Sequence, residues 1–271
     1  MIKNLKGQVE YYTFEILAPY PELRHAVMSR HGPGGQDWTF SYRDEVDPEL
    51  INANIDLAVK ALGIKTPIQV GQVHGAQALI LAPQETYLPK KPEDVWVGFD
   101  AIISAFGHSL MIKVADCQGL IVYDPTSSAL ALVHSGWRGS VQNVIGRTVK
   151  TMAKTFKLNP KNFLACCAPS LGPCHAEFIN YQTELPQAFW EFRDEKNLFD
   201  FTAISRKQLT ASGLKDDNIE FSGVCTRCSE DFYSYRRGDS GRFAIIAGLA
   251  TGSGQSDADE IGGAIGAGGA P

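Results

Sequence analysis

The stretch from Val114 to Ser140 constrains the fold most, because it places a thiol and an imidazole beside apolar runs. It reads VADCQGLIVYDPTSSALALVHSGWRGS. Residues 110–114, 120–122 and 129–133 are aliphatic and β-rich, so we predict three buried strands there. Cys117 and His134 then lie at strand ends, where rigid strands hold side chains and the adjoining loops open to solvent. This pattern is typical of an active site.

A second histidine lies upstream, in the segment 69–76, which reads QVGQVHGA. β-like segments over 66–73 and 78–82 flank His74. Both histidines lie close to glycine, and Cys117 follows an aspartate, which indicates close backbone approach and polarity at all three places. We predict that His74, Cys117 and His134 converge.

The converging side chains are a metal-ligand set. Two imidazoles and a thiolate suit Zn²⁺, and three protein ligands leave a fourth position for water or substrate, as in a catalytic site. Copper accepts the same ligands, so ligand type alone leaves the metal open. The alternative for each residue taken singly is structural: a small buried thiol and two histidines hydrogen-bonded at strand ends.

The other cysteines point to reduced thiols. The chain has six cysteines, including the adjacent pair 166–167, and no export signal that would favour disulfides. Cys225 and Cys228 form a Cys-x-x-Cys, but a structural zinc site usually needs a second pair at similar spacing. The neighbouring residues Cys174 and His175 are possible ligands, although adjacent residues in an extended chain rarely bind one ion. We therefore expect packed or simply reduced thiols.

Two arginines are candidates for binding an anion. Arg30 lies in a glycine-rich loop, SRHGPGG, where a surface turn with a solvated arginine is the common alternative. Arg138 follows His134 at the expected start of an amphipathic helix, whose free N–H groups favour anions. The alternative for this segment is that Trp137 packs and Arg138 pairs with an acidic neighbour.

The sequence contains no internal repeat and no convincing linker, so we expect a single domain. One helix is well marked: Asp47 and Pro48 open it, apolar residues recur at helical spacing, and Gly63 ends it. The chain has 271 residues, 44% of them hydrophobic, which suffices for a core over residues 1–250. Residues 251–271 are Gly-rich without an apolar face, and we expect a flexible tail.

The bulk charge argues against polyanionic partners. With 25 Lys and Arg against 30 Asp and Glu, the net charge is −5, so we expect neither nucleic acid nor membrane as a partner. The first residues contain no apolar run long enough for a signal peptide. We expect a cytoplasmic protein, and favour a monomer.

Seven short motifs occur in the order seen in the laccase-domain family, whose members have been called multicopper polyphenol oxidases and zinc-dependent purine nucleoside phosphorylases. They begin at residues 29, 72, 100, 115, 134, 169 and 234 and read SRHG, QVHG, DA, ADC, HSGWRG, PSLGPC and SYRR. The chain resembles this family from about residue 26 to residue 249. Small departures, such as Gly119 and Ser135, remove no ligand.

The resemblance implies a mixed α/β (α+β) fold, a single domain with a mixed β-sheet core flanked by helices. It also implies a zinc enzyme with His74, Cys117 and His134 as ligands. It implies purine nucleosides and phosphate as substrates: phosphorolysis of adenosine, inosine, guanosine and methylthioadenosine, with adenosine deamination as a second activity. Asp116 is the nearest carboxylate for proton transfer, or a residue that orients a ligand. We expect Arg30, Gln72 and Arg138 to bind substrate or phosphate.

Two other functions compete with the zinc phosphorylase. Cys117 and His134 without metal would form the nucleophile and base of a hydrolase or amidase, and relatives linked to peptidoglycan-precursor editing make this a live alternative. A copper polyphenol oxidase fits less well, because such an enzyme needs many more histidines than the six present.

Overall fold

The computed structural model describes residues 1–42, 46–85 and 95–251, and two β-sheets dominate this part of the chain. The first sheet has the order β1 (Ile2–Lys6), β2 (Val9–Thr13), β3 (Leu23–Met28), β13 (Phe243–Leu249), β8 (Leu110–Val114), β4 (Ile68–Gly71) and β6 (Trp96–Val97). The second has the order β12 (Ile219–Phe221), β11 (Leu164–Cys167), β9 (Gln118–Asp124), β10 (Ala129–Ser135), β7 (Ala101–Ser104) and β5 (Ala78–Ile80). Both sheets mix parallel and antiparallel pairs.

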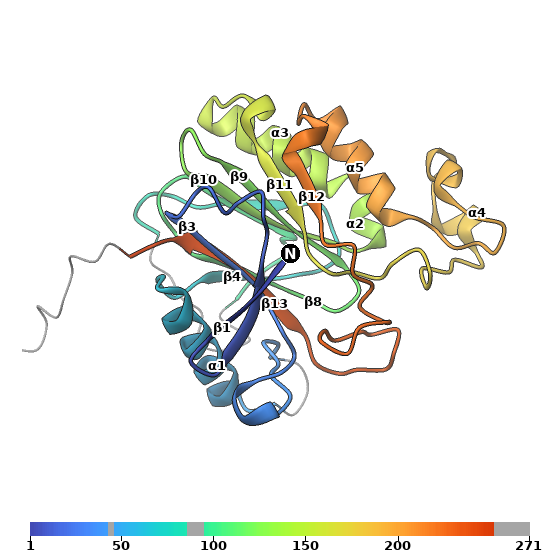
Figure 1. Cartoon of the computed structure of the whole chain (residues 1–271). Helices are drawn as coiled ribbons and strands as arrows, with labels where there is room; N and C mark the ends of the chain where they lie inside the picture. The colour runs from blue at the N-terminus through green and yellow to red at the C-terminus, as the bar shows by residue number, and fades with distance from the viewer. Residues whose placement is uncertain (43–45, 86–94, 252–271) are drawn as a thin grey trace, which may run out of the picture.

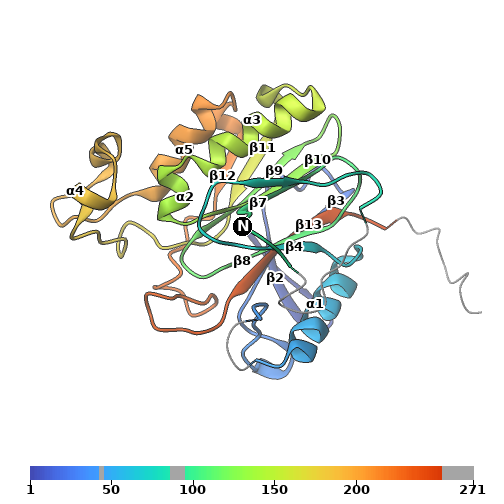
Figure 2. The same ribbon diagram turned by 180° about the vertical axis from the view of Figure 1, so that it is seen from behind.

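The central strands of the second sheet, such as β9 and β10, are apolar on both faces, and both of these faces are covered. Along β9, Ile121 and Tyr123 pack into a core shared with the first sheet, whereas Leu120 and Val122 face the helices. This core lies between the sheets, and the helices cover the outer faces (Figures 1 and 2). The expected mixed α+β architecture is confirmed. The core contains two mixed sheets, whereas the sequence predicted a single mixed β-sheet core.

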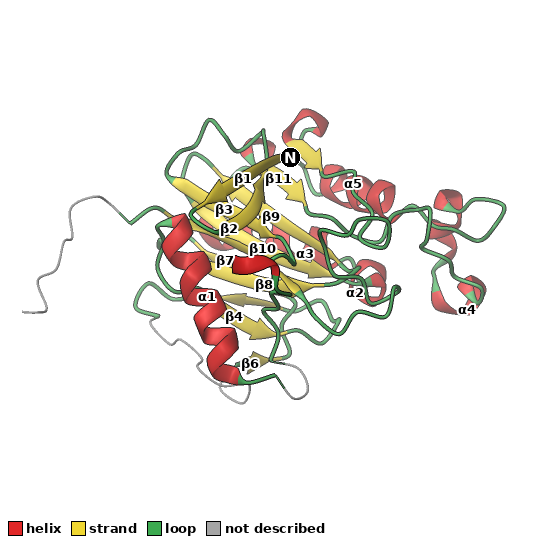
Figure 3. Cartoon of the chain, turned by 60° about the horizontal axis from the view of Figure 1, so that its bottom comes forward, coloured by secondary structure: helices red, strands yellow, loops and turns green. Residues whose placement is uncertain are grey.

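Helix α1 (Pro48–Leu62) covers the outer face of the first sheet (Figure 3). The Asp47 side chain accepts a hydrogen bond from the Glu49 N–H, and Gly63 ends the helix in the left-handed conformation with φ 68°. This helix has the ends that the sequence predicted.

Helices α3 (Val144–Phe156) and α5 (Phe201–Ala211) pack on the second sheet. The sequence predicts a single amphipathic helix after His134, which is wrong in one respect: this segment forms two helices. A short helix α2 (Trp137–Val141) ends first, and Asn143, with φ 57°, starts α3 by accepting the Gly146 N–H. A cap replaces a helical turn here, so α2 and α3 are separate.

The remaining helical segments are short: α4 (Tyr181–Glu184) and 3₁₀ turns at Pro33–Gly35, Pro160–Asn162, Gln187–Phe192 and Asp216–Asn218. None of the described helices is long and apolar enough to cross a membrane. The expected tail lies, apart from Thr251, outside the described residues.

Candidate functional site

His74, Cys117 and His134 meet where three chain segments leave the two sheets at one edge. The parallel pair β4 and β8 directs the segments that follow them, with His74 and Cys117, to the same side. Strand β10 ends there too, because its register sets His134 opposite Gly119 at the start of β9. The ligand atoms of the three residues lie within 4.8 Å of one another.

Asp100 holds the two histidines in place and is fully buried. Its carboxylate accepts hydrogen bonds from the His134 Nδ1 at 2.7 Å and from the His74 and Gly75 N–H groups at 2.9 and 2.6 Å. Burial raises the pKa of Asp100, but these hydrogen bonds outweigh it and lower the pKa. With Nδ1–H donating to a carboxylate, Nε2 is the ring nitrogen of His134 that can bind a metal, which would displace its proton.

The backbone around the three residues is adapted to close approach. His74 has a φ of 61°, a left-handed conformation that the bonds to Asp100 stabilise. Gly136 cannot carry a side chain without rearrangement: a Cβ there would lie 2.7 Å from the His74 Cδ2 and 3.1 Å from the Cys117 Sγ. The side chains of His74 and Cys117 thus pack closely against Gly136, an arrangement that fits a metal ion held by His74, Cys117 and His134.

The electrostatics of Cys117 and His134 favour an ion pair. Burial raises the pKa of the Cys117 thiol, but the charge of His134 and hydrogen bonds from both histidines outweigh it and lower this pKa to about 6. Burial lowers the pKa of His134, and the Cys117 thiolate and Asp100 together raise it to about 9. A thiolate at neutral pH is the form that binds metal or attacks an electrophile.

The three residues line a cavity of about 570 Å³, within the range of small-molecule sites. Three further candidate residues, Gln72, Asp116 and Arg138, also line it, and their roles in binding or proton transfer stay predictions. Arg30 is not among the lining residues; its guanidinium binds the Asp37 carboxylate through two hydrogen bonds and lies 4.6 Å from the Tyr233 ring. The Arg30 side chain therefore pairs with Asp37 outside the cavity.

Asp116 and Gln72 are both tied to neighbouring backbone. Asp116 has a φ of 79°, and its two oxygens accept from the Thr226 hydroxyl and the Arg236 N–H, each at 2.6 Å. The Gln72 amide donates to the Lys113 carbonyl at 2.7 Å and accepts from the Lys113 N–H at 2.9 Å. Both residues therefore shape the wall of the cavity as well as line it.

Sequence analysis missed Lys113 as a residue of the cavity. Its Nζ donates to the Gln69 Oε1 at 2.9 Å, and burial lowers its pKa to about 8. The signal was a lone lysine inside the apolar run of β8, LMIKV. Such a residue interrupts a buried strand at a cost, which marks it as a candidate functional group.

We expect Lys113 to make stability depend on pH between about 8 and 10.5. In that window the folded protein releases a proton that the unfolded chain, with a lysine pKa of 10.5, still holds, so stability rises with pH. The free energy of unfolding of the wild type should rise by about 1–3 kcal/mol relative to Lys113→Met. Urea unfolding of both proteins across this range measures the difference, and parallel pH curves would refute it.

A second group of potential ligands was also missed. Cys174, His175, Cys225 and Cys228 place one ligand atom each within 4.8 Å of one another. The sequence predicted packed or reduced thiols instead of this cluster. The reason is that Cys225 and Cys228 are joined by the adjacent pair Cys174 and His175 and not by a second Cys-x-x-Cys.

Proteins named purine nucleoside phosphorylase are similar in sequence to most of the chain. A purine nucleoside phosphorylase of Bacteroides thetaiotaomicron is 27% identical over 269 residues, covering 87% of this chain and 94% of the relative. A purine nucleoside phosphorylase of Streptomyces coelicolor is 32% identical over 201 residues, covering 70% and 78%.

Solved structures share the fold. YlmD from Geobacillus stearothermophilus aligns with a TM-score of 0.80 at 20% identity, covering 92% of this chain and 99% of that one. The Neisseria meningitidis protein NMB0706 aligns with a TM-score of 0.71 at 23% identity, covering 89% and 99%. Residues 24–250 match the family described as multi-copper polyphenol oxidoreductase laccase. The chain therefore belongs to this laccase family, as its sequence motifs indicated.

Proposed function

We propose that this protein is a zinc-dependent purine nucleoside phosphorylase. The observation that carries the proposal is one cavity lined by both a three-donor metal set and the cationic side chains of Lys113 and Arg138. Relatives named purine nucleoside phosphorylase at 27–32% identity support it. Zinc fits the donors, since His74, Cys117 and His134 supply three ligands of the kinds it prefers.

Aromatic side chains in the cavity suit a purine base. Trp137, Phe178 and Phe201 line it, and the ring centroids of Trp137 and Phe178 lie 5.9 Å apart. Flat apolar surfaces of this kind stack on aromatic ligands. We propose adenosine, inosine, guanosine and methylthioadenosine as substrates, with adenosine deamination as a second activity of the same cavity.

In the proposed reaction a phosphate oxygen attacks the anomeric carbon of the ribose. The bond between this carbon and the purine nitrogen breaks at the same time. Arg138 and Lys113 bind the phosphate, the latter as a cation below about pH 8. Asp116 is the one carboxylate among the described residues that line the cavity, and we assign it proton transfer at the leaving purine. A bound zinc ion would supply Lewis-acid polarisation of a substrate oxygen.

Phosphate dependence tests this function. We expect the protein to release hypoxanthine from inosine in the presence of phosphate, with ribose 1-phosphate as the second product. Arg138→Gln should raise the KM for phosphate about tenfold or more with a smaller change in kcat, because it removes a charged contact worth about 1.5–3 kcal/mol. Steady-state kinetics at varied phosphate concentration measure the changes in KM and kcat separately.

The control for Arg138→Gln is Arg206→Gln. Arg206 pairs with Asp216 on the surface at 2.6 Å and does not line the cavity, so phosphate kinetics should stay unchanged. Base release that proceeds equally without phosphate would exclude phosphorolysis. A coupled assay for ammonia release from adenosine tests deamination separately.

A metal-independent hydrolase or amidase is the second candidate, in the class that would edit peptidoglycan precursors. The observation that favours it is the chain of contacts from Cys117 through His134 to Asp100, which resembles a nucleophile, a base and the group that orients the base. Hydrolysis of an amide bond that persists after metal removal would support this candidate and count against the phosphorylase.

A copper polyphenol oxidase is the least favoured candidate. Of the six histidines in the chain, only His74 and His134 belong to the donor set in the cavity. The other described donor cluster contains three thiols and one histidine, His175, a set better matched to zinc than to several copper ions. We expect phenol oxidation to be absent.

A further inference from the structure

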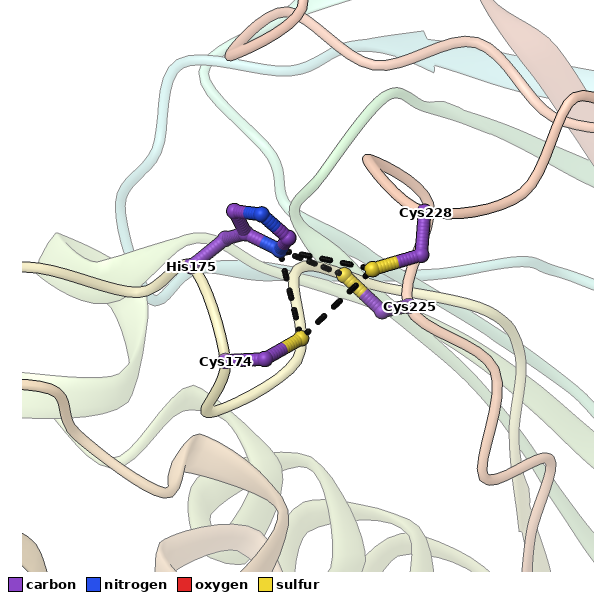
Figure 4. Close-up of side chains that lie close together, drawn as sticks. All are labelled: Cys174, His175, Cys225 and Cys228. Carbon is purple, nitrogen blue, oxygen red and sulfur yellow. Dashed lines mark hydrogen bonds between the residues drawn. The ribbon is translucent and has the colours of Figure 1, made fainter.

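Four side chains outside the cavity converge on one point. Cys174 and His175 follow β11, Cys225 and Cys228 follow β12, and their side chains point toward one another (Figure 4). Strands β11 and β12 are parallel neighbours, so the segments that follow them leave the sheet at the same edge. The sheet topology therefore brings together two pairs that are about 50 residues apart in sequence.

We propose that these four residues form a structural zinc site, separate from the metal site in the cavity. Three thiols and one imidazole are a complete donor set for a closed tetrahedral zinc site. The proposal does not depend on the function of the cavity, because it rests on the geometry of residues that the proposed reaction does not use.

Three donor-to-donor distances lie within about 0.1 Å of the edges of such a tetrahedron, and a fourth is about 0.4 Å shorter. Bonds of about 2.3 Å to sulfur and 2.0–2.1 Å to nitrogen give edges of about 3.8 Å between sulfurs and 3.6 Å between sulfur and nitrogen. The Cys174 and Cys228 sulfurs are 3.7 Å apart. The His175 Nδ1 lies 3.2, 3.6 and 3.5 Å from the sulfurs of Cys174, Cys225 and Cys228.

The local backbone explains how adjacent residues 174 and 175 both reach this point. A turn forms where the His175 and Ala176 N–H groups donate to the Gly172 carbonyl, at 3.0 and 3.1 Å. A second turn folds the Cys-x-x-Cys, with the Cys228 N–H donating to the Cys225 carbonyl at 3.2 Å. A Cβ at Gly172 would lie 2.9 Å from the Cys225 Cβ, so this glycine permits the close approach.

A disulfide would explain only part of this arrangement. It would join two of the three thiols and leave the third thiol and the His175 ring without a role. The histidine nitrogen that faces the sulfurs is the same Nδ1 in all three contacts. A single cation uses all four donors at once.

This site would brace one wall of the cavity. Thr226, inside the Cys-x-x-Cys, donates from its hydroxyl to the Asp116 Oδ1 at 2.6 Å. The Leu171 N–H, in the loop that carries Cys174, donates to the Asp116 carbonyl at 2.8 Å. Asp116 precedes Cys117, so an ion that fixes both loops also fixes the segment that carries Cys117.

Metal stoichiometry tests the proposal. Wild-type protein prepared without chelator should contain about two zinc ions per chain. The double variant Cys225→Ser/Cys228→Ser should keep about one, and the reciprocal variant His74→Ala/Cys117→Ser should also keep about one, in the other site. The single variant Cys166→Ser, which alters a buried thiol outside both clusters, is the matched control and should keep both.

Cobalt substitution distinguishes the two sites by their number of thiolates. The wild type reconstituted with Co²⁺ should show thiolate-to-cobalt charge transfer, of which the Cys225→Ser/Cys228→Ser variant loses the larger part. Titrating wild-type protein with an organomercurial, which displaces zinc from thiolates, supplies a readout that needs no variant. Unchanged metal content in the Cys225→Ser/Cys228→Ser variant, or a disulfide among these cysteines in the wild type, would overturn the proposal.

Discussion

Replacing Cys117 with alanine is expected to remove the metal from the cavity and to lower the kcat of phosphorolysis at least about 1000-fold, or about 4 kcal/mol in activation free energy. The reason is geometric. Cys117 supplies the one thiolate in the donor set, while Asp100 fixes the ring of His134 and the backbone of His74 in an arrangement that fits three ligands. Metal analysis and steady-state kinetics on the same preparation measure both effects.

The matched control for this substitution is Cys166→Ala. Cys166 is a buried thiol in the core between the sheets, so its loss should cost about 1 kcal/mol of stability and leave metal and turnover in place. Wild-type protein treated with a chelator distinguishes two roles of Cys117, metal ligand and nucleophile, because it keeps the thiol but lacks the metal. Full turnover in the chelated protein would contradict the role of Cys117 as a ligand.

Replacing Asp100 with asparagine is expected to weaken metal binding by about 10–100-fold and to lower the free energy of unfolding by about 2 kcal/mol. One carboxylate oxygen accepts from His74 and His134 and the other from Gly75, so an amide must turn its NH₂ toward one of these donors. Metal competition with a chromophoric chelator measures the affinity.

Asp124 provides the comparison for Asp100. It is equally buried, at 1% exposure, but its carboxylate accepts from Thr126 and Ser127 in the turn between β9 and β10, away from the cavity. Asp124→Asn should destabilise the protein without changing metal affinity. Equal metal affinity in the Asp100→Asn variant and the wild type would exclude Asp100 as a positioning residue.

Features with local causes could be predicted from the sequence. Helix α1 has its cap, its proline and its terminal glycine within one segment, and each acts on its immediate neighbours. The convergence of His74, Cys117 and His134 was predicted because each follows or ends an apolar run. The break between α2 and α3 escaped prediction, since the apolar spacing continues through Asn143 while the backbone there adopts the left-handed conformation.

Features that depend on strand order could not be predicted. Asp100 reaches His134 because β7 pairs with β10, with Ala101 opposite Val133, and no local pattern specifies that pairing. The Cys174 and Cys225 loops meet because β11 and β12 are parallel neighbours. The ion pairs of Arg30 with Asp37 and Asp239 also depend on the fold, and its role in binding substrate or phosphate stays a prediction.

The most direct test of a metal in the cavity is anomalous diffraction at the zinc absorption edge, on crystals of protein that releases purine base in a phosphate-dependent reaction. We expect an anomalous peak among the side chains of His74, Cys117 and His134. Active protein without any metal at these three residues would contradict it.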